Sequence, residues 1–536
     1  MSVIQKINFK KTDFSFKNNS NYDDKFSHKR MVFLWMIILS GYLLFIIQWY
    51  SIQNFASGYE KIIGKLDEPA LNAIPNWTIT LMRGIGSILA GWIIVKVGHK
   101  YSVIIALSLM VISFPFIIVA KIPIGEMVNN IRPINFSLFV IFRLFLAIGG
   151  TSLITYTNSI IAKMSQNKKS LFVNINAFGF NAGAFFANIF FVFGISKFVN
   201  NNDIWMWILL SFVFLVVILL ILYIIFGVEV IEKPTNITKF SDKKIGFRKL
   251  IKDSYTWKLG ILFGCWLIVA IFMTSPTMRT FIEQSPANFN VLLKWNQNHT
   301  IVTSLKDATL NTASNIKIGS GYEWVWPTFI SCFVSGLIIG FFIITPFNKT
   351  IYKRKKFMAF IFVIGLIFAA ISIMSGYFGG YDNKIALTSF LFFIFLSGIF
   401  LWGIQPILLN HYQQQPQTTP EYAGVVSGMV WGLGYIFYTI IEIFLSISQS
   451  YVGVIKLFTI ENFENIINKN FGILKTVEFA GSMIVIVGYF SISALLFIPL
   501  FSLPDSGHKD KLGNFVVFNV DWRFWYWNFR KKEILF

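Results

Sequence analysis

The sequence predicts an all-α membrane protein with twelve transmembrane helices in two pseudo-symmetric six-helix bundles. Of its 536 residues, 55% are hydrophobic and only 13% are charged, whereas about 25% of an ordinary soluble domain is charged. The mean hydropathy is +0.63. Apolar runs of about twenty residues, the length that crosses the hydrocarbon core as a helix, recur along the whole chain.

Six apolar segments precede a polar, basic stretch, and six follow it. The first six are expected near 31–52, 77–97, 101–120, 136–162, 171–196 and 204–228. The second six are expected near 259–280, 325–346, 357–379, 386–410, 422–447 and 480–503.

This pattern divides the chain into five parts. They are a cytoplasmic N-terminal tail, a six-helix bundle, a basic cytoplasmic linker, a second six-helix bundle, and a cytoplasmic tail rich in aromatic and basic residues. Their boundaries are 1–30, 31–228, 229–257, 258–503 and 504–536, with long outer loops at 281–324 and 448–479.

The distribution of charge predicts the orientation of these spans. The formal net charge is +21, from 46 Lys and Arg against 25 Asp and Glu. The basic residues concentrate in the two tails, the central linker and the turns on the same side of the bundle, which the positive-inside rule assigns to the cytoplasm. We therefore expect both termini inside a cell (plasma) membrane, and we assign the positive charge to anionic lipid rather than to nucleic acid.

The chain offers little material for catalysis or metal binding. Its two cysteines, Cys265 and Cys332, lie in apolar stretches and provide neither a disulfide framework nor a metal cluster. The five histidines are scattered through tails, turns and loops, and no glycine-rich nucleotide loop is present. We predict no metal, no cofactor, no enzymatic activity and no direct use of ATP.

Small residues four apart occur in spans 2, 5, 8 and 11. In lipid, helices approach closely where such residues line up, and spans 2 and 8, like 5 and 11, hold equivalent places in the two halves. The set comprises Ser87, Gly179, Gly183, Gly336, Gly340, Gly424, Gly428 and Gly432.

The turn after the second span carries a recognisable motif. It reads Gly-Trp-Ile-Ile-Val-Lys-Val-Gly-His-Lys and resembles the loop signature of the Major Facilitator Superfamily, in which a glycine precedes an acidic residue, basic residues and a second glycine. The matching positions are Gly91, Lys96, Gly98 and Lys100, with His99 a partial match. Val95 stands where the family has Asp.

Span 4 adds a second resemblance, because Arg143 is followed by Gly149 and Gly150. The resemblance implies two bundles that rock about a site near the middle of the membrane. It also implies that spans 2, 5, 8 and 11 pack between the bundles and that spans 1, 4, 7 and 10 line the site. We expect a monomer in the lipid bilayer that moves a small solute, with or without a co-transported ion.

Ionisable groups inside the membrane are costly and are therefore candidate functional residues. Arg83 is expected about two turns into span 2 from the outer side, Arg143 in the outer half of span 4, and Arg279 near the outer end of span 7. Three arginines against one acid favour an anionic solute, since guanidinium groups bind phosphate and carboxylate well. Alternatively, Arg143 bonds to neighbouring helices while Arg83 and Arg279 reach the lipid headgroups.

Glu442, in span 11, is the one clearly intramembrane carboxylate in the sequence. It either couples transport to protons or neutralises an arginine; we favour the second, because a buried cation needs a partner. In span 5, Asn174, Asn181 and Asn188 are spaced by seven and form one polar stripe. The further candidates for substrate binding are Tyr42, Gln48, Asn181, Trp402, Gln405 and Tyr438.

We conclude that the sequence indicates a secondary active or facilitative transporter of a small polar, anionic metabolite, phosphorylated or carboxylate, working by alternating access. A proton-coupled or facilitative carrier of a neutral nutrient such as a sugar, or a drug exporter, is the alternative within transport. A membrane receptor, a scaffold, or a membrane-embedded enzyme acting on lipid is the alternative of another class.

Overall fold

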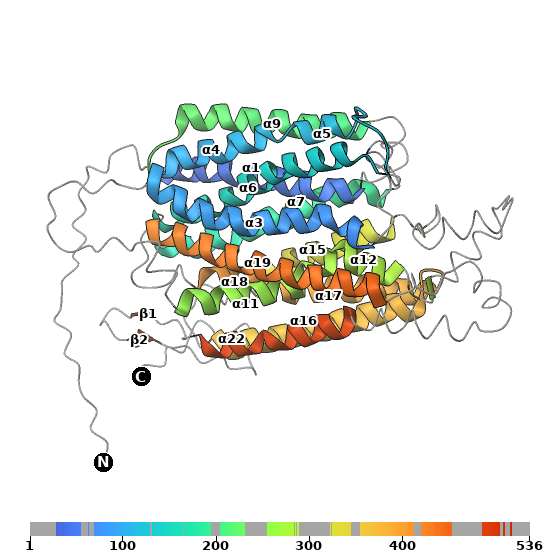
Figure 1. Ribbon diagram of the computed structural model, residues 1–536. Coiled ribbons are helices and arrows are strands. Elements are labelled where there is room, and N and C mark those ends of the chain that lie inside the picture. The colour runs from blue at the N-terminus through green and yellow to red at the C-terminus, as the bar shows by residue number, and fades with distance from the viewer. Residues whose placement is uncertain are drawn as a thin grey trace, which may run out of the picture.

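The computed structural model is a bundle of long helices lying side by side (Figure 1). It describes residues 28–54, 63, 69–128, 131–163, 166–193, 204–230, 254–283, 285, 287–288, 322, 324–344, 354–411, 420–452, 485–503, 508–509 and 515–516. The predicted tails, central linker and long outer loops lie largely outside these residues.

Each predicted span coincides with one helix or with two or three consecutive helices. The first half contains α1 (His28–Asn54), α3 (Pro69–Val97), α4 (His99–Ile112), α5 (Pro115–Val119), α6 (Pro133–Lys163), α7 (Gln166–Val192) and α9 (Ile204–Phe226). The second half contains α11 (Ser254–Ala270), η2 (Phe272–Thr274), α12 (Pro276–Glu283), α15 (Val325–Ile343), α16 (Arg354–Gly379), α17 (Lys384–Gly403), α18 (Gln405–Asn410), α19 (Pro420–Val452) and a last span, Val485–Ser502, that includes α22 (Phe497–Ser502).

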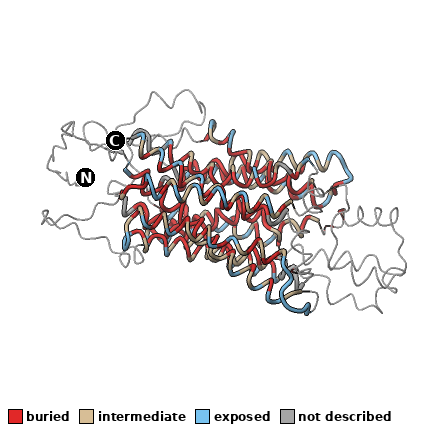
Figure 2. Tube along the Cα trace, turned by 90° about the horizontal axis from the view of Figure 1, so that it is seen from above, coloured by how far each residue is buried: buried red, intermediate tan, exposed pale blue. Residues whose placement is uncertain are grey.

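Among the described residues, 11 helical segments are long and apolar enough to cross a membrane, and α7 packs among them as the twelfth helix of the bundle. Residues inside the bundle are buried, while many on its outer faces are exposed (Figure 2). The exposed side chains of α9 include Phe214, Ile221 and Ile225. Such an apolar exterior suits contact with lipid.

Two short strands, β1 (His508–Lys509) and β2 (Phe515–Val516), form an antiparallel pair.

Three predicted spans break just before or at a proline. Span 3 divides into α4 and α5 at Pro115, span 7 passes through η2 and resumes as α12 at Pro276, and span 10 divides into α17 and α18 beside Pro406. Proline lacks an N–H and disfavours helix in the residue before it, so a helix ends there and restarts with proline in its first turn.

The two halves meet most extensively where α3 packs against α19. A Cβ atom added to Gly428 would lie 2.5 Å from the Ser87 carbonyl oxygen and 3.2 Å from the Gly91 Cα. One added to Gly432 would lie 2.9 Å from the Gly84 oxygen. Only glycine permits so close an approach of two backbones.

Four of the small residues expected between the halves lie elsewhere. Gly179 and Gly183 on α7 face α1, against Leu39 and Ile46. Gly336 and Gly340 on α15 face α17, against Gly398, Ile399 and Gly403. The α7–α15 contact does cross the boundary, but larger side chains make it, including Phe178 and Phe341, whose rings are 5.1 Å apart.

The turn between α3 and α4 is held by a carboxylate that follows α9. Glu229 accepts hydrogen bonds from the backbone N–H groups of His99 (2.7 Å) and Lys100 (3.2 Å), at the start of α4. Gly98 has φ +86, and a Cβ there would collide with Glu229. A carboxylate at a helix N-terminus is favoured by the free N–H groups and the helix dipole. Val95 is 52% exposed and takes no part in this contact.

We call the end of the bundle that holds this turn the linker end and the opposite end, beside α5 and α12, the loop end (Figure 1).

Candidate functional site

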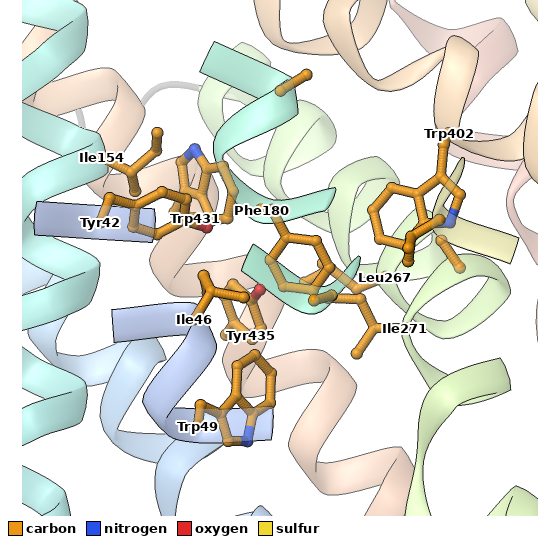
Figure 3. Packing of buried hydrophobic residues seen from close by; sticks show 14 of the residues in the cluster. Tyr42, Ile46, Trp49, Ile154, Phe180, Leu267, Ile271, Trp402, Trp431 and Tyr435 are labelled. Carbon is orange, nitrogen blue, oxygen red and sulfur yellow. The ribbon is translucent and has the colours of Figure 1, made fainter. Parts of the chain in front are cut away.

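Four side chains from four helices meet at the middle of the bundle. Tyr42 on α1, Arg83 on α3, Phe180 on α7 and Tyr435 on α19 each lie within one residue of the midpoint of their helix. Figure 3 shows Tyr42, Phe180 and Tyr435 converging, with Trp49 beside them. Arg83 is deeper than the two turns expected, because α3 begins at Pro69, eight residues before the predicted start.

Arg83 is fully buried and surrounded by aromatic rings. Its guanidinium carbon lies 4.1 Å from the ring centre of Tyr435 and 4.6 Å from that of Trp49, with Phe45 and Phe180 at 5.3 and 5.7 Å. Such cation–π contacts stabilise a desolvated cation by about 2 kcal/mol or more. The alternative in which Arg83 extends to the lipid headgroups is therefore wrong.

The hydrogen-bonding capacity of Arg83 is mostly unused. Nη2 donates to the Tyr42 hydroxyl oxygen at 3.1 Å, while Nε and Nη1 have no partner among the described residues. No described carboxylate forms an ion pair with this guanidinium group. A buried cation without an anion is unfavourable by several kcal/mol, so an anionic group that entered this layer would be bound strongly.

A second polar layer lies two helical turns nearer the loop end. Trp49 donates from Nε1 to Asn76 Oδ1 at 3.1 Å, and Asn76 Nδ2 donates to Glu442 Oε1 at 2.6 Å. Glu442 is fully buried. Its Oε1 thus pairs with an amide from the other half, rather than with the arginine expected from the sequence, and the Tyr438 hydroxyl lies near the same carboxyl group.

The two layers repeat one spacing on three helices. Tyr42 and Trp49, Asn76 and Arg83, and Tyr435 and Glu442 are each seven residues apart, which is close to two turns and returns to the same helix face.

Between the layers, the Thr439 hydroxyl donates to Thr80 Oγ1 at 2.9 Å. The antiparallel helices α3 and α19 thus meet in a ladder of three contacts, 76 with 442, 80 with 439, and 83 with 435.

Most of the other candidates are buried near this centre without direct contact to Arg83. Trp402 packs its ring on Phe180, at 5.2 Å. Asn181 Nδ2 donates to the Val334 carbonyl oxygen on α15, across the boundary between the halves. Among the described residues, Gln48 Oε1 and Gln405 Oε1 have no hydrogen-bond partner, and the Tyr438 hydroxyl lies near Glu442.

Two asparagines of the α7 stripe have different partners in the structure. Asn181 reaches the second half, whereas Asn188 Nδ2 donates to the Ala184 carbonyl oxygen of its own helix. Asn174 is buried, like the other two.

The other two arginines have partners of their own. Arg143 Nη1 donates to the Pro75 carbonyl oxygen at 3.2 Å, which fits the alternative that this residue ties α6 to α3. Arg279 pairs with Glu283 one turn along α12 at 2.8 Å, and its side chain is 36% exposed. The charge of Arg279 is therefore already balanced, and Arg83 alone is both central and without a counter-ion among the described residues.

The sequence reasoning missed several residues that join helices or the two halves. Asn76 and Trp49 look ordinary in a chain rich in Asn and aromatic residues, but the shared spacing of seven could have found them. At the linker end, Asn158 Nδ2 donates to Ser427 Oγ at 2.8 Å across the boundary. Glu229 was assigned to the basic linker, because an acid after the C-terminus of one span gives no local signal that it caps another helix 130 residues earlier.

The comparisons with known proteins fit this arrangement. A family profile described as "Mycoplasma MFS transporter" matches residues 139–450, more than half of the chain. The chain belongs to this family of transporters. The prediction of a Major Facilitator Superfamily transporter, rather than an enzyme, is thereby confirmed.

Curated relatives cover most of the transporter. A "Major facilitator superfamily transporter" of Mycoplasma pneumoniae is 26% identical over 501 residues, covering 77% of this chain and 85% of that protein. One from Mycoplasma genitalium is 26% identical over 504 residues, covering 79% and 84%.

Among solved structures, a D-xylose-proton symporter aligns with a TM-score of 0.55 at 14% identity, over 89% of this chain and 98% of that one. This likeness shows the fold alone, and it confirms the predicted twelve-helix, two-bundle architecture.

Proposed function

We propose that the transporter carries a small anionic metabolite, phosphorylated or carboxylate, and that Arg83 binds its anionic group at the middle of the membrane. One observation carries this proposal: a fully buried guanidinium group at the boundary between the halves has two nitrogens without partners and no described carboxylate to balance it. A solute anion would supply both the missing hydrogen bonds and the missing charge.

A neutral sugar is the second candidate. It rests on the aromatic faces around Arg83, and the D-xylose-proton symporter named above shares the fold. A neutral solute, however, leaves the buried charge of Arg83 uncompensated. The anion therefore accounts for more of the site.

The test uses the purified transporter in proteoliposomes. Thermal stability and counterflow are measured with inorganic phosphate, a hexose phosphate, a dicarboxylate, a neutral hexose and a nucleoside. Ligands that bind the folded form raise the melting temperature by mass action. We expect at least one anion to stabilise the wild-type protein, and the stabilisation to be lost in Arg83→Gln and strongly reduced in Arg83→Lys.

Arg132→Lys is the matched control, because Arg132 donates to the Gly125 carbonyl oxygen at the exposed loop end. Stabilisation and counterflow by the neutral hexose or nucleoside alone would overturn the anion proposal in favour of the second candidate.

We further propose that the linker end faces the cytoplasm of a cell membrane, with both termini on that side and the five-part division given above. The basic residues of the described part that support this lie at the linker end, among them Lys29, Lys100, Lys163 and Lys355. Monomeric transport, with Glu442 as the place where a co-transported proton would act, belongs to the same proposal.

A further inference from the structure

The Trp49 side chain touches both polar layers. The face of its indole ring lies over Arg83, with 4.6 Å between the ring centre and the guanidinium carbon. Its edge donates from Nε1 to Asn76, and Asn76 in turn donates to Glu442 of the other half. The ring is 2% exposed and its N–H is engaged, so neither contact changes without moving the other.

The first contact depends on the charge of Arg83. A cation–π attraction requires a net positive charge over the ring, and it is strongest when that charge is desolvated. An anion that pairs with the guanidinium group cancels much of that charge and draws the group towards itself. Binding at the central layer therefore weakens the hold of Arg83 on Trp49.

The second contact determines whether the loop end stays closed. The Asn76–Glu442 hydrogen bond crosses the boundary between the halves, and the Trp49 N–H fixes the orientation of the Asn76 amide for it. If Trp49 shifts, the side-chain oxygen of Asn76 (Oδ1) loses its hydrogen-bond donor in a buried environment. That loss disfavours the closed arrangement.

From this geometry we infer that Trp49 is a positioning residue that couples occupancy of Arg83 to opening at the loop end. Anion binding relaxes the stacking of Trp49 on Arg83, releases the Asn76 amide, and so loosens the bond to Glu442. The inference rests on the proposed function, since it takes an anion at Arg83 as the trigger. The two coupled sites are the anion site at Arg83 and the Asn76–Glu442 bond, and Trp49 is the element that links them.

The test measures anion binding and the opening of the boundary between the halves separately. A single cysteine is placed between the two layers, at the boundary of the halves, by Thr80→Cys, in a background with Cys265→Ala and Cys332→Ala. Thr80 is fully buried against α19 and becomes reachable by a thiol reagent only when the halves part. Binding is followed by the melting temperature with inorganic phosphate, the hexose phosphate and the dicarboxylate, and opening by the labelling rate with the same anions.

Trp49→Phe keeps an aromatic face over Arg83 and removes the N–H that holds Asn76. With an anion that stabilises the unaltered background, we expect labelling to change about fivefold or more on binding. In Trp49→Phe, the anion still raises the melting temperature, but the labelling ratio falls to about one because the link is cut. Asn76→Ala removes the acceptor of the same hydrogen bond and should likewise bring the labelling ratio to about one.

Trp266→Phe is the matched control, because Trp266 loses an equivalent buried hydrogen bond, to the Leu401 carbonyl oxygen, without touching Arg83. It should retain the full labelling response. A wild-type response in both Trp49→Phe and Asn76→Ala overturns the coupling role alone. Loss of the response in Trp266→Phe would overturn it too, since the effect would then follow from a general loss of buried bonds. Absence of Arg83-dependent stabilisation by all three anions overturns the proposed function itself.

Discussion

At the scale of single residues, the site depends on one arginine and on the hydroxyl that holds it. The sequence identified Arg83 as a candidate because ionisable groups inside a membrane are costly, and Tyr42 because it lies on a span expected to line the site. It did not distinguish Arg83 from Arg143 and Arg279, because partners that lie far apart in the chain decide their roles. Pro75 and Glu283 occupy the other two arginines, whereas aromatic rings from three helices surround Arg83.

Tyr42→Phe tests how the central guanidinium group is held. The change removes the acceptor of Arg83 Nη2 and leaves a further buried N–H without a partner, which costs about 1–3 kcal/mol. We expect a lower melting temperature and a weaker response to anions, measured by thermal shift. Tyr489→Phe also deletes a buried hydroxyl, one that donates to the Val269 carbonyl oxygen, and should lower stability without altering the anion response. Equal anion responses in the two variants would contradict this account of Tyr42.

At the scale of helices, the boundary between the halves is a long antiparallel contact of α3 with α19. The sequence predicted that small residues on these two spans would pack together, and Ser87, Gly91 and Gly428 do so. It also assigned the glycines of spans 5 and 8 to the boundary, which was wrong. A small residue indicates a close approach but does not say which of several neighbouring helices approaches. That choice depends on how each helix is rotated within the bundle.

Gly428→Ala tests this contact. The new Cβ would meet backbone atoms of Ser87 and Gly91, which cannot move aside, so α3 and α19 must separate. Overpacking of this kind costs about 1–3 kcal/mol, and we expect a lower melting temperature together with slower counterflow. In Gly488→Ala the new Cβ would meet the end of the Leu445 side chain, which can adjust. If both variants behaved like wild type, the rigid contact of α3 with α19 would have no role in stability.

At the scale of the whole molecule, the fold was largely predictable because the membrane leaves few solutions. Every span must be a helix of about twenty residues, and hydropathy alone locates such segments. The breaks at Pro115, Pro276 and Pro406 follow from the chemistry of proline but were not predicted. Hydropathy averaged over a whole span hardly changes when one residue is proline. The ladder of contacts between α3 and α19 could not be predicted, because it depends on the register of two helices more than 300 residues apart.

Labelling from outside the cell tests the proposed orientation. In the cysteine-free background, Glu126→Cys introduces an exposed thiol at the loop end and Tyr101→Cys introduces one at the linker end. We expect a membrane-impermeant thiol reagent to modify the first in intact cells and the second only after the membrane is permeabilised. The reverse pattern would place the basic residues outside and contradict the proposed topology.

The seven-residue spacing shared by α1, α3 and α19 also bears on how such a chain can evolve. A single residue inserted between Asn76 and Arg83 would rotate one of them by about 100° relative to the other. Asn76 would then turn away from Glu442, or Arg83 away from Tyr435. Substitutions along these segments can be absorbed one at a time, whereas a change of length would break at least one rung of the ladder. Among relatives that keep this mechanism, we therefore expect the interval of seven to persist on all three helices even where the residue types drift, and insertions to accumulate in the loops instead.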